Sequence, residues 1–209
     1  MATKFKKKYR FNPQSLKIKE QFFTICNNIE ANLPDHPFLL IVTSLAQSQN
    51  IANASGYLAL AYSEQRKRVL IVDANLYEPS LHYVFNVENT LGFSDLLLSE
   101  PHMNTNNPVR ITDYLYCLPT SESIYEPTAL LTMGSLPTLI DGWKEDFDVI
   151  LFHTSDYLDT PIPQITAKLS DGIVLVIQEG RDKLEKIVDV KKQIEQSKHE
   201  VTGTIILSS

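Results

Sequence analysis

Residues 68–73 read Arg-Val-Leu-Ile-Val-Asp, a short apolar run that begins after a basic residue and ends in an acidic one. Continuous rather than alternating hydrophobicity is typical of a strand that a parallel sheet buries on both faces. Similar runs stand at 37–44, 147–153 and 171–177. Because helical patterns separate these runs, the sequence predicts a doubly wound α/β fold, with a mostly parallel sheet sandwiched by helices.

The segments between the strands carry helical signals. Apolar residues of 16–33 recur at steps of three and four, which predicts an amphipathic helix, and 51–64 is a second helix rich in Ala and Leu. The other expected elements are helix 94–98, strand 114–118, helix 130–143, helix 183–197 and strand 201–207. Since no repeat or linker divides the chain, we expect a basic flexible segment over 1–15 and a single domain over 16–209.

The composition narrows the possible functions. The 209 residues carry a formal net charge of −6, which argues against nucleic-acid binding because such proteins neutralise phosphates with a basic face. The longest apolar run, 38–42, is too short to span a bilayer. The two cysteines, Cys26 and Cys117, show no disulfide or metal spacing and are expected to be half-buried thiols. These features predict a cytoplasmic protein.

The first ten residues depart from the acidic average. Their basic members are Lys4, Lys6, Lys7, Lys8 and Arg10. Two interpretations stay open for this segment. It is either a solvated terminus or a peripheral contact with an anionic membrane surface, at the inner face of the cell membrane.

The loop after 37–44 is the first place to look for a site, because ligands of open parallel sheets bind at the carboxyl ends of the strands. A phosphate-binding loop needs glycines, a lysine, and a Ser or Thr hydroxyl for magnesium. The candidate loop has none of them in place. It reads Ser48, Gln49, Asn50, Ile51, Ala52 and Asn53. We therefore expect neither a nucleotide cofactor nor a bound metal.

Several ordered segments share one spacing with a known family, and they are 20–29, 42–44, 69–76, Pro79, His82, Phe85, 91–97, 126–131 and 148–154. These segments resemble the bacterial tyrosine kinase domains of capsule and exopolysaccharide export, a branch of the P-loop superfamily that also holds Min and Par proteins. The similarity covers the chain from about residue 19 to residue 207. The resemblance implies a P-loop fold.

The departures from that family fall on its chemical positions. Ile51 stands where the family has its phosphate-binding lysine, and Ala52 where it has the magnesium-binding hydroxyl. Asp73 is retained at the first acidic position, whereas Asn75 and His153 replace two others. A charge-assisted bond to phosphate is worth roughly 1.5–3 kcal/mol, which an aliphatic side chain cannot supply. The resemblance thus implies a vestigial site with His153 as a neutral histidine, and we expect a pseudokinase that is not an enzyme.

The first helix departs from the family in the same way. In the kinases it carries a Glu-x-x-Arg-x-x-Arg repeat associated with ring assembly, and here the three positions are Glu20, Phe23 and Cys26. Steps of three place these side chains on one helix face. This mostly apolar face is either core packing or a changed partner interface.

The leading hypothesis is a catalytically inactive interaction or regulatory module of exopolysaccharide biosynthesis and export. Its partner would be a membrane polysaccharide copolymerase, a kinase paralogue or a second copy of the chain. One alternative is a divergent ATPase or tyrosine autokinase, which would use the N-terminus of the helix at 51–64 as an anion site. The other is a Min- or Par-type positioning protein, which is disfavoured because 45–49 contains no lysine.

Overall fold

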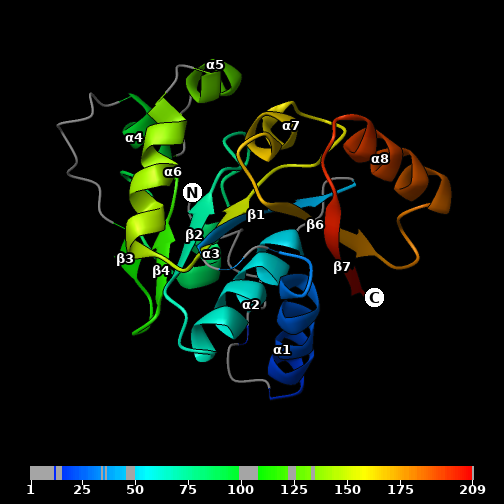
Figure 1. The fold of residues 1–209 in the computed structure, drawn as a ribbon. Helices are drawn as coiled ribbons and strands as arrows, with labels where there is room; N and C mark the ends of the chain where they lie inside the picture. The colour runs from blue at the N-terminus through cyan, green and yellow to red at the C-terminus, as the bar shows by residue number, and fades with distance from the viewer. Residues whose placement is uncertain are drawn as a thin grey trace, which may run out of the picture.

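The structure, a computed structural model, describes residue 12 and residues 16–33, 35, 37–45, 50–98, 108–121, 126–132 and 135–208. Within these ranges the chain forms one seven-stranded sheet with helices on both faces (Figure 1). The predicted doubly wound α/β class is confirmed. The expectation of a basic flexible segment over 1–15 lies outside the described residues, except at Asn12.

The sheet is parallel apart from one edge. Its strands are β1 (Phe38–Ser44), β2 (Val69–Asp73), β3 (Val109–Arg110), β4 (Leu115–Leu118), β5 (Val149–His153), β6 (Gly172–Gln178) and β7 (Val201–Leu207). Their order is β3-β4-β2-β5-β1-β6-β7, and β3 runs antiparallel to β4. Strand β5 lies between β1 and β2, with His153 in register with both Val42 and Asp73. The carboxyl ends of three central strands therefore meet at one edge.

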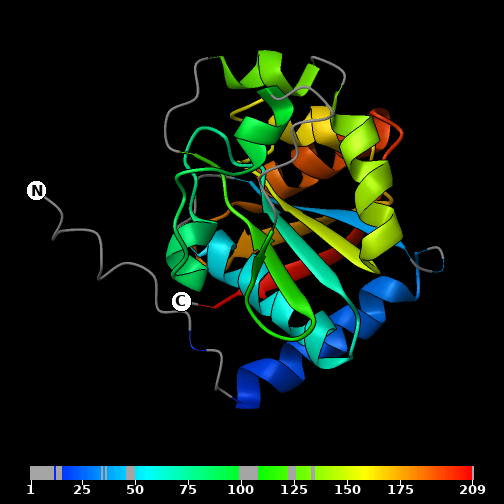
Figure 2. The same ribbon diagram turned by 90° about the vertical axis from the view of Figure 1, so that its left-hand side faces the viewer.

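The helices form two layers. They are α1 (Leu16–Glu30), α2 (Ile51–Glu64), α3 (Leu81–Phe85), α4 (Phe93–Leu98), α5 (Pro127–Thr132), α6 (Ser135–Asp146), α7 (Ile162–Ala167) and α8 (Leu184–Gln196). Helices α1 to α3 cover one face of the sheet, and α4 to α8 cover the other (Figures 1 and 2). Neighbouring residues of a strand serve opposite cores, as Leu40 and Leu39 do in β1, because successive side chains point to opposite faces.

Most predicted elements lie within two or three residues of their observed bounds, and those of α2 and β7 coincide. The single helix predicted over 130–143 is wrong, since α5 ends at Thr132 and α6 begins at Ser135. Pro137 explains the new start, because proline lacks an N–H and is tolerated only near the first turn of a helix. The sequence patterns also miss α3, α7 and β3, which have only five, six and two residues.

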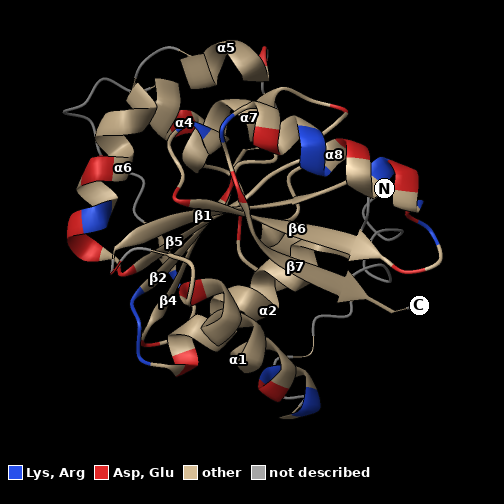
Figure 3. Ribbon diagram, turned by 45° about the vertical axis from the view of Figure 1, so that its right-hand side comes forward, with Lys and Arg blue, Asp and Glu red and all other residues tan. Residues whose placement is uncertain are grey.

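Charged side chains and the two cysteines lie in different parts of the molecule. Lys, Arg, Asp and Glu lie mainly on the outer helices and the connecting turns (Figure 3). Cys26 and Cys117 are fully buried free thiols rather than half-buried ones, and burial raises the pKa of both. None of the helices in the described ranges has the length and apolar character that crossing a membrane requires.

Candidate functional site at the carboxyl ends of the central strands

The candidate phosphate loop leads into α2, and its described part is apolar. Asn50 precedes the helix, and Ile51 and Ala52 in the first turn are buried in the core between α2 and the sheet. Ser48 and Gln49 lie outside the described residues. Asn53 follows, and its Oδ1 is buried with no hydrogen-bond partner among the described atoms. The first turn of α2 thus places two apolar side chains in the core.

Asp73, at the end of β2, is fully buried and holds the following loop. Its Oδ2 accepts hydrogen bonds from the backbone N–H groups of Ser80, at 2.7 Å, and Leu81, at 2.8 Å. Its Oδ1 accepts a bond from the N–H of Asn75 at 3.3 Å. Burial raises the pKa of Asp73 to about 7, although these three hydrogen bonds favour the ionised form and lower it in part. This carboxyl group therefore organises the start of α3.

His153, at the end of β5, is fully buried and joins two other elements. Its Nδ1 lies 3.1 Å from Ser55 Oγ on α2, and its Nε2 lies 3.0 Å from Ser80 Oγ before α3. Burial lowers the pKa of His153 to about 3, so the ring is neutral near pH 7. A neutral imidazole donates from one nitrogen and accepts at the other, and here both are used. The ring is a structural link between α2 and the loop before α3.

A second polar connection closes the end of β1. Ser44 Oγ donates to the Asp156 carboxylate, and Tyr157 N donates to the Ser44 carbonyl at 2.9 Å. Thr43 Oγ1 donates to the Ser155 carbonyl at 2.8 Å. Burial raises the pKa of Asp156. The loop after β5 is therefore fastened to the end of β1 by its own side chains and backbone.

These residues do not fit a magnesium–nucleotide site of the P-loop kind. Magnesium takes ionised carboxylate, hydroxyl and water oxygens. Asp73 already serves three backbone N–H groups, and Ala52 has no hydroxyl. In the described ranges, no group of three or more His, Cys, Asp and Glu side chains is placed to hold a metal ion.

The first helix separates the three residues expected on one face. Glu20 and Phe23 are exposed, whereas Cys26 is buried between α1 and α2. A turn of about 100° per residue displaces the third residue of such a series by roughly 120° from the first, which explains the correction. Cys26 therefore packs in the core, and only Glu20 and Phe23 are available to a partner.

Comparison with known proteins identifies sequence relatives of this chain. No protein-family model matches the chain. The chain is 29% identical over 195 residues to the tyrosine-protein kinase YwqD of Bacillus subtilis. The aligned region covers 93% of this chain and 82% of that protein. Further curated relatives are also named tyrosine-protein kinases. The chain is related to the bacterial tyrosine-protein kinases.

Solved structures agree on the fold of this relative of the kinases. The crystal structure of the chimerical protein CapA2B2 matches with a TM-score of 0.85 at 24% identity, over 93% of this chain and 86% of that one. The septum site-determining protein MinD of Pyrococcus horikoshii, solved with Mg-ADP, matches with a TM-score of 0.68 at 19% identity, over 81% of this chain and 69% of that one. Both likenesses show the fold alone, and they confirm the P-loop NTPase-like class.

The comparison corrects one functional expectation. The sequence predicts a protein that is not an enzyme, and this prediction is wrong at the level of the family, because the relatives are named kinases. Sequence reasoning also missed Ser55 and Ser80, which hold His153. Ser55 gave a usable signal, since it is a polar residue within the apolar run of 51–62.

Proposed function

We propose that this chain is a kinase-type interaction module of a bacterial capsule or exopolysaccharide export system. It works in the cytoplasm at the inner face of the cell membrane and docks on a membrane polysaccharide copolymerase, with a kinase paralogue as the other candidate partner. The relationship to the bacterial tyrosine-protein kinases supports this system.

The exposed side of α1 is the observation that carries the proposal. Leu16 and Phe23 are 76% and 48% exposed, and they are seven residues apart, which places both on one side of the helix. The adjoining side of α1 is already packed, with Phe22, Cys26 and Ile29 buried. Full burial of a phenylalanine stabilises a complex by roughly 1.5–3 kcal/mol. A partner that covers this side would gain that free energy.

Charge substitutions on α1 test the docking surface. Phe23→Glu is expected to weaken binding to the cytoplasmic segment of the copolymerase by at least roughly tenfold, as for an aromatic anchor in an interface. Asn28→Glu is the matched control, because residue 28 is exposed about 140° around the helix from Phe23. Calorimetric titration of both variants would reject the α1 surface if Phe23→Glu bound like the unsubstituted chain, or if both variants lost affinity equally.

The basic residues Lys4, Lys6, Lys7, Lys8 and Arg10 extend the proposal to the membrane, although they lie outside the described residues. Each basic side chain near an anionic surface contributes about 1 kcal/mol. Sedimentation with phosphatidylserine vesicles should therefore retain the full chain and release a variant with these five residues changed to Gln. Equal retention of both proteins would remove the membrane contact from the proposal.

A second candidate function is phosphoryl transfer through a divergent loop, and the kinase names of the relatives favour it. The N-terminus of α2 offers backbone N–H groups to an anion. Mass spectrometry after incubation with ATP and magnesium tests this function. Phosphotyrosine that appears in the chain and disappears in Asp73→Ala would support it, and an unmodified chain would leave docking as the sole candidate. The Min- or Par-type alternative rests on the shared fold only.

A further inference from the structure

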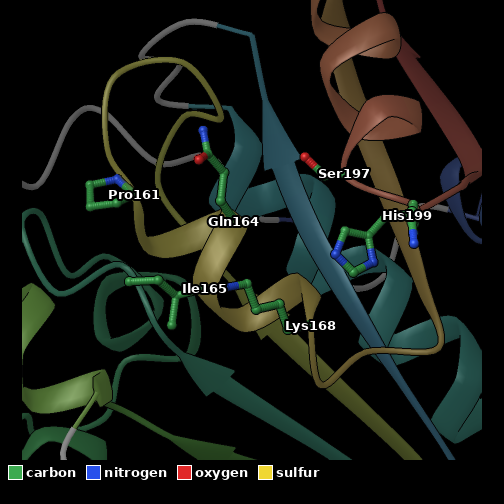
Figure 4. Close-up of a pocket in the computed structure, with 7 residues that line it drawn as sticks. Pro161, Gln164, Ile165, Lys168, Ser197 and His199 are labelled. Atoms are coloured by element: carbon green, nitrogen blue, oxygen red, sulfur yellow. The ribbon is translucent and has the colours of Figure 1, made fainter.

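A cleft on the opposite side of the sheet from α1 borders the loop after β5. It has a volume of about 560 Å³ and opens between α7 and the turn that joins α8 to β7 (Figure 4). This volume falls in the range of roughly 300–1,000 Å³ that is typical of small-ligand sites. Figure 4 shows Pro161 and Ile165 of the α7 side across from Ser197 and His199 of the turn. The cleft therefore combines an apolar wall with a polar one.

The charged side chains that line the cleft are two lysines. Lys168 at the end of α7 and Lys198 in the turn line it together with His199, and no acidic side chain is among the lining residues. Neither lysine takes part in the ion pairs found within the described ranges. The chain as a whole carries a net charge of −6, so this concentration of cationic groups runs against its average. The cleft suits an anionic group on an apolar carrier.

The backbone holds the basic turn in place. Lys198 adopts a left-handed conformation with φ of 62°, a position after a helix where glycine is usual because a Cβ is unfavourable there. Lys198 N donates to the Glu195 carbonyl at 2.9 Å, and His199 N donates to the Ile194 carbonyl at 3.1 Å. These two backbone bonds fix the place of Lys198 and His199 beside α7.

We propose that this cleft binds phosphotyrosine in a peptide segment. Lys168 and Lys198 meet the phosphate with charge-assisted hydrogen bonds. The aromatic ring lies on Pro161 and Ile165. The inference rests on the proposed function in one respect, because phosphotyrosine is the group that tyrosine-protein kinases produce. It adds to that function a site that recognises the phosphorylated product.

Calorimetric titration of the full chain with a Gly-phosphotyrosine-Gly peptide tests the site. Binding is expected for this peptide and not for its unphosphorylated form, and the double variant Lys168→Gln/Lys198→Gln should weaken it by roughly tenfold or more. The double variant Lys186→Gln/Lys192→Gln is the charge-matched control, since both residues are exposed on α8 and do not line the cleft. The proposal is overturned if neither peptide binds at millimolar concentration or if the control double variant weakens binding as much as Lys168→Gln/Lys198→Gln.

Titration with inorganic phosphate and phenyl phosphate identifies the part of the ligand that is recognised. Phenyl phosphate should bind more tightly than inorganic phosphate because its ring contacts the apolar wall. Equal affinities would show a general anion site and contradict the proposal. A nucleotide or a uronic acid that competes more strongly than the phosphopeptide would reassign the cleft to that ligand.

Glycine substitutions separate binding from folding. Lys198→Gly relieves the left-handed backbone and should raise the thermal midpoint while it lowers affinity for the phosphopeptide. Arg66→Gly is its backbone control, because Arg66 follows α2 with φ of 63° and is remote from the lining residues. It should raise the midpoint and leave affinity unchanged. A purely structural Lys198 would behave like Arg66 in both measurements, which would refute the proposal.

The phosphopeptide measurement is independent of docking through α1. Phe23→Glu should leave phosphopeptide affinity unchanged, and the two lysine substitutions should leave copolymerase binding unchanged. Failure of the cleft and failure of the docking proposal therefore give different results.

Discussion

The strand-end site and the cleft between α7 and α8 place their polar groups in opposite states. At the strand ends, Asp73 and His153 are fully buried, and each is bonded to other parts of the same chain. In the cleft, Lys168 and Lys198 are exposed and form no ion pair within the described residues. The strand ends have the position of a ligand site in this fold, whereas the cleft has side chains that are available to a ligand.

This difference separates two properties of a binding site: its position in the fold and the side chains that are free to bind a ligand. The topology of a doubly wound sheet determines where loops and helix N-termini converge, and the side chains determine what can bind there. Here the convergence point is filled with internal hydrogen bonds. Four predictions test this comparison. It implies that side chains at the strand ends contribute strongly to the stability of the fold and that those of the cleft contribute little.

The largest expected effect is on the pH dependence of stability. The raised pKa of Asp73, from 3.8 to about 7, contributes stability below pH 3.8 that is lost as the pH rises through 7. The lowered pKa of His153, from 6.5 to about 3, contributes stability above pH 6.5 that is lost as the pH falls through 3. The two contributions have opposite slopes and largely cancel between pH 4 and 6.5.

Removing either group should expose the other slope. In His153→Asn the free energy of unfolding should fall, relative to the unsubstituted chain, by up to about 4 kcal/mol from pH 4 to 7. In Asp73→Asn it should rise by a similar amount from pH 3 to 6.5. Urea denaturation across this pH range measures both. Parallel pH profiles for the three proteins would show that neither group titrates as its burial requires.

The second effect concerns nucleotide affinity. Ile51→Lys would supply the cation missing from the first turn of α2, and affinity for ATP should rise by roughly tenfold, as for a charge-assisted bond to phosphate. Ile51→Met is the control, because methionine has a similar length and no charge. Equilibrium dialysis with labelled ATP compares them. If both substitutions gave the same affinity as Ile51, the absent lysine would not be what limits binding.

The third effect concerns the hydrogen bonds of His153. Ser80→Ala leaves Nε2 of the buried ring without its partner, which should lower the free energy of unfolding by about 1–2 kcal/mol. Ser63→Ala is the control, since Ser63 is also buried but its Oγ bonds only the Leu60 carbonyl of its own helix. Urea midpoints distinguish the two. An equal loss in both variants would mean that the bond from His153 to the loop before α3 adds nothing.

The smallest effect is expected in the cleft. Lys168→Gln should change stability by less than about 0.5 kcal/mol, because the side chain is exposed and forms no ion pair in the described part of the chain. Lys144→Gln provides a contrast, since Lys144 Nζ lies 3.5 Å from Asp171 Oδ2 with both side chains partly buried. A marked loss of stability in Lys168→Gln would indicate that Lys168 supports the fold, contrary to the comparison.

The sequence predicted the framework because the framework follows from local patterns. The apolar run of 201–207 and the Ala-rich run of 51–64 match β7 and α2, since period and composition are sufficient for such elements. Helix α7 escaped prediction because a six-residue helix is too short to show a period. Pro137 was a signal for the start of α6 that the continuous apolar pattern around it obscured.

The site was predicted only in part, and the reason is distance along the chain. The sequence predicts that His153 ends a strand, which is confirmed, and the structure shows Ile51 and Ala52 buried. It cannot show that Ser55 and Ser80 take both nitrogens of the ring, because they lie 98 and 73 residues from His153. The burial of Cys26 was not predicted for a different reason, since spacing alone does not tell which side of α1 faces α2.

The buried ring of His153 also offers a way to measure how often the strand ends open. The ring lies between two serines, and the hydrogen on one of its nitrogens is shielded from water. That hydrogen can exchange with solvent only when α2 and the loop before α3 separate from β5. Its exchange rate with deuterium would therefore time the opening of the strand ends in the folded protein, without denaturant.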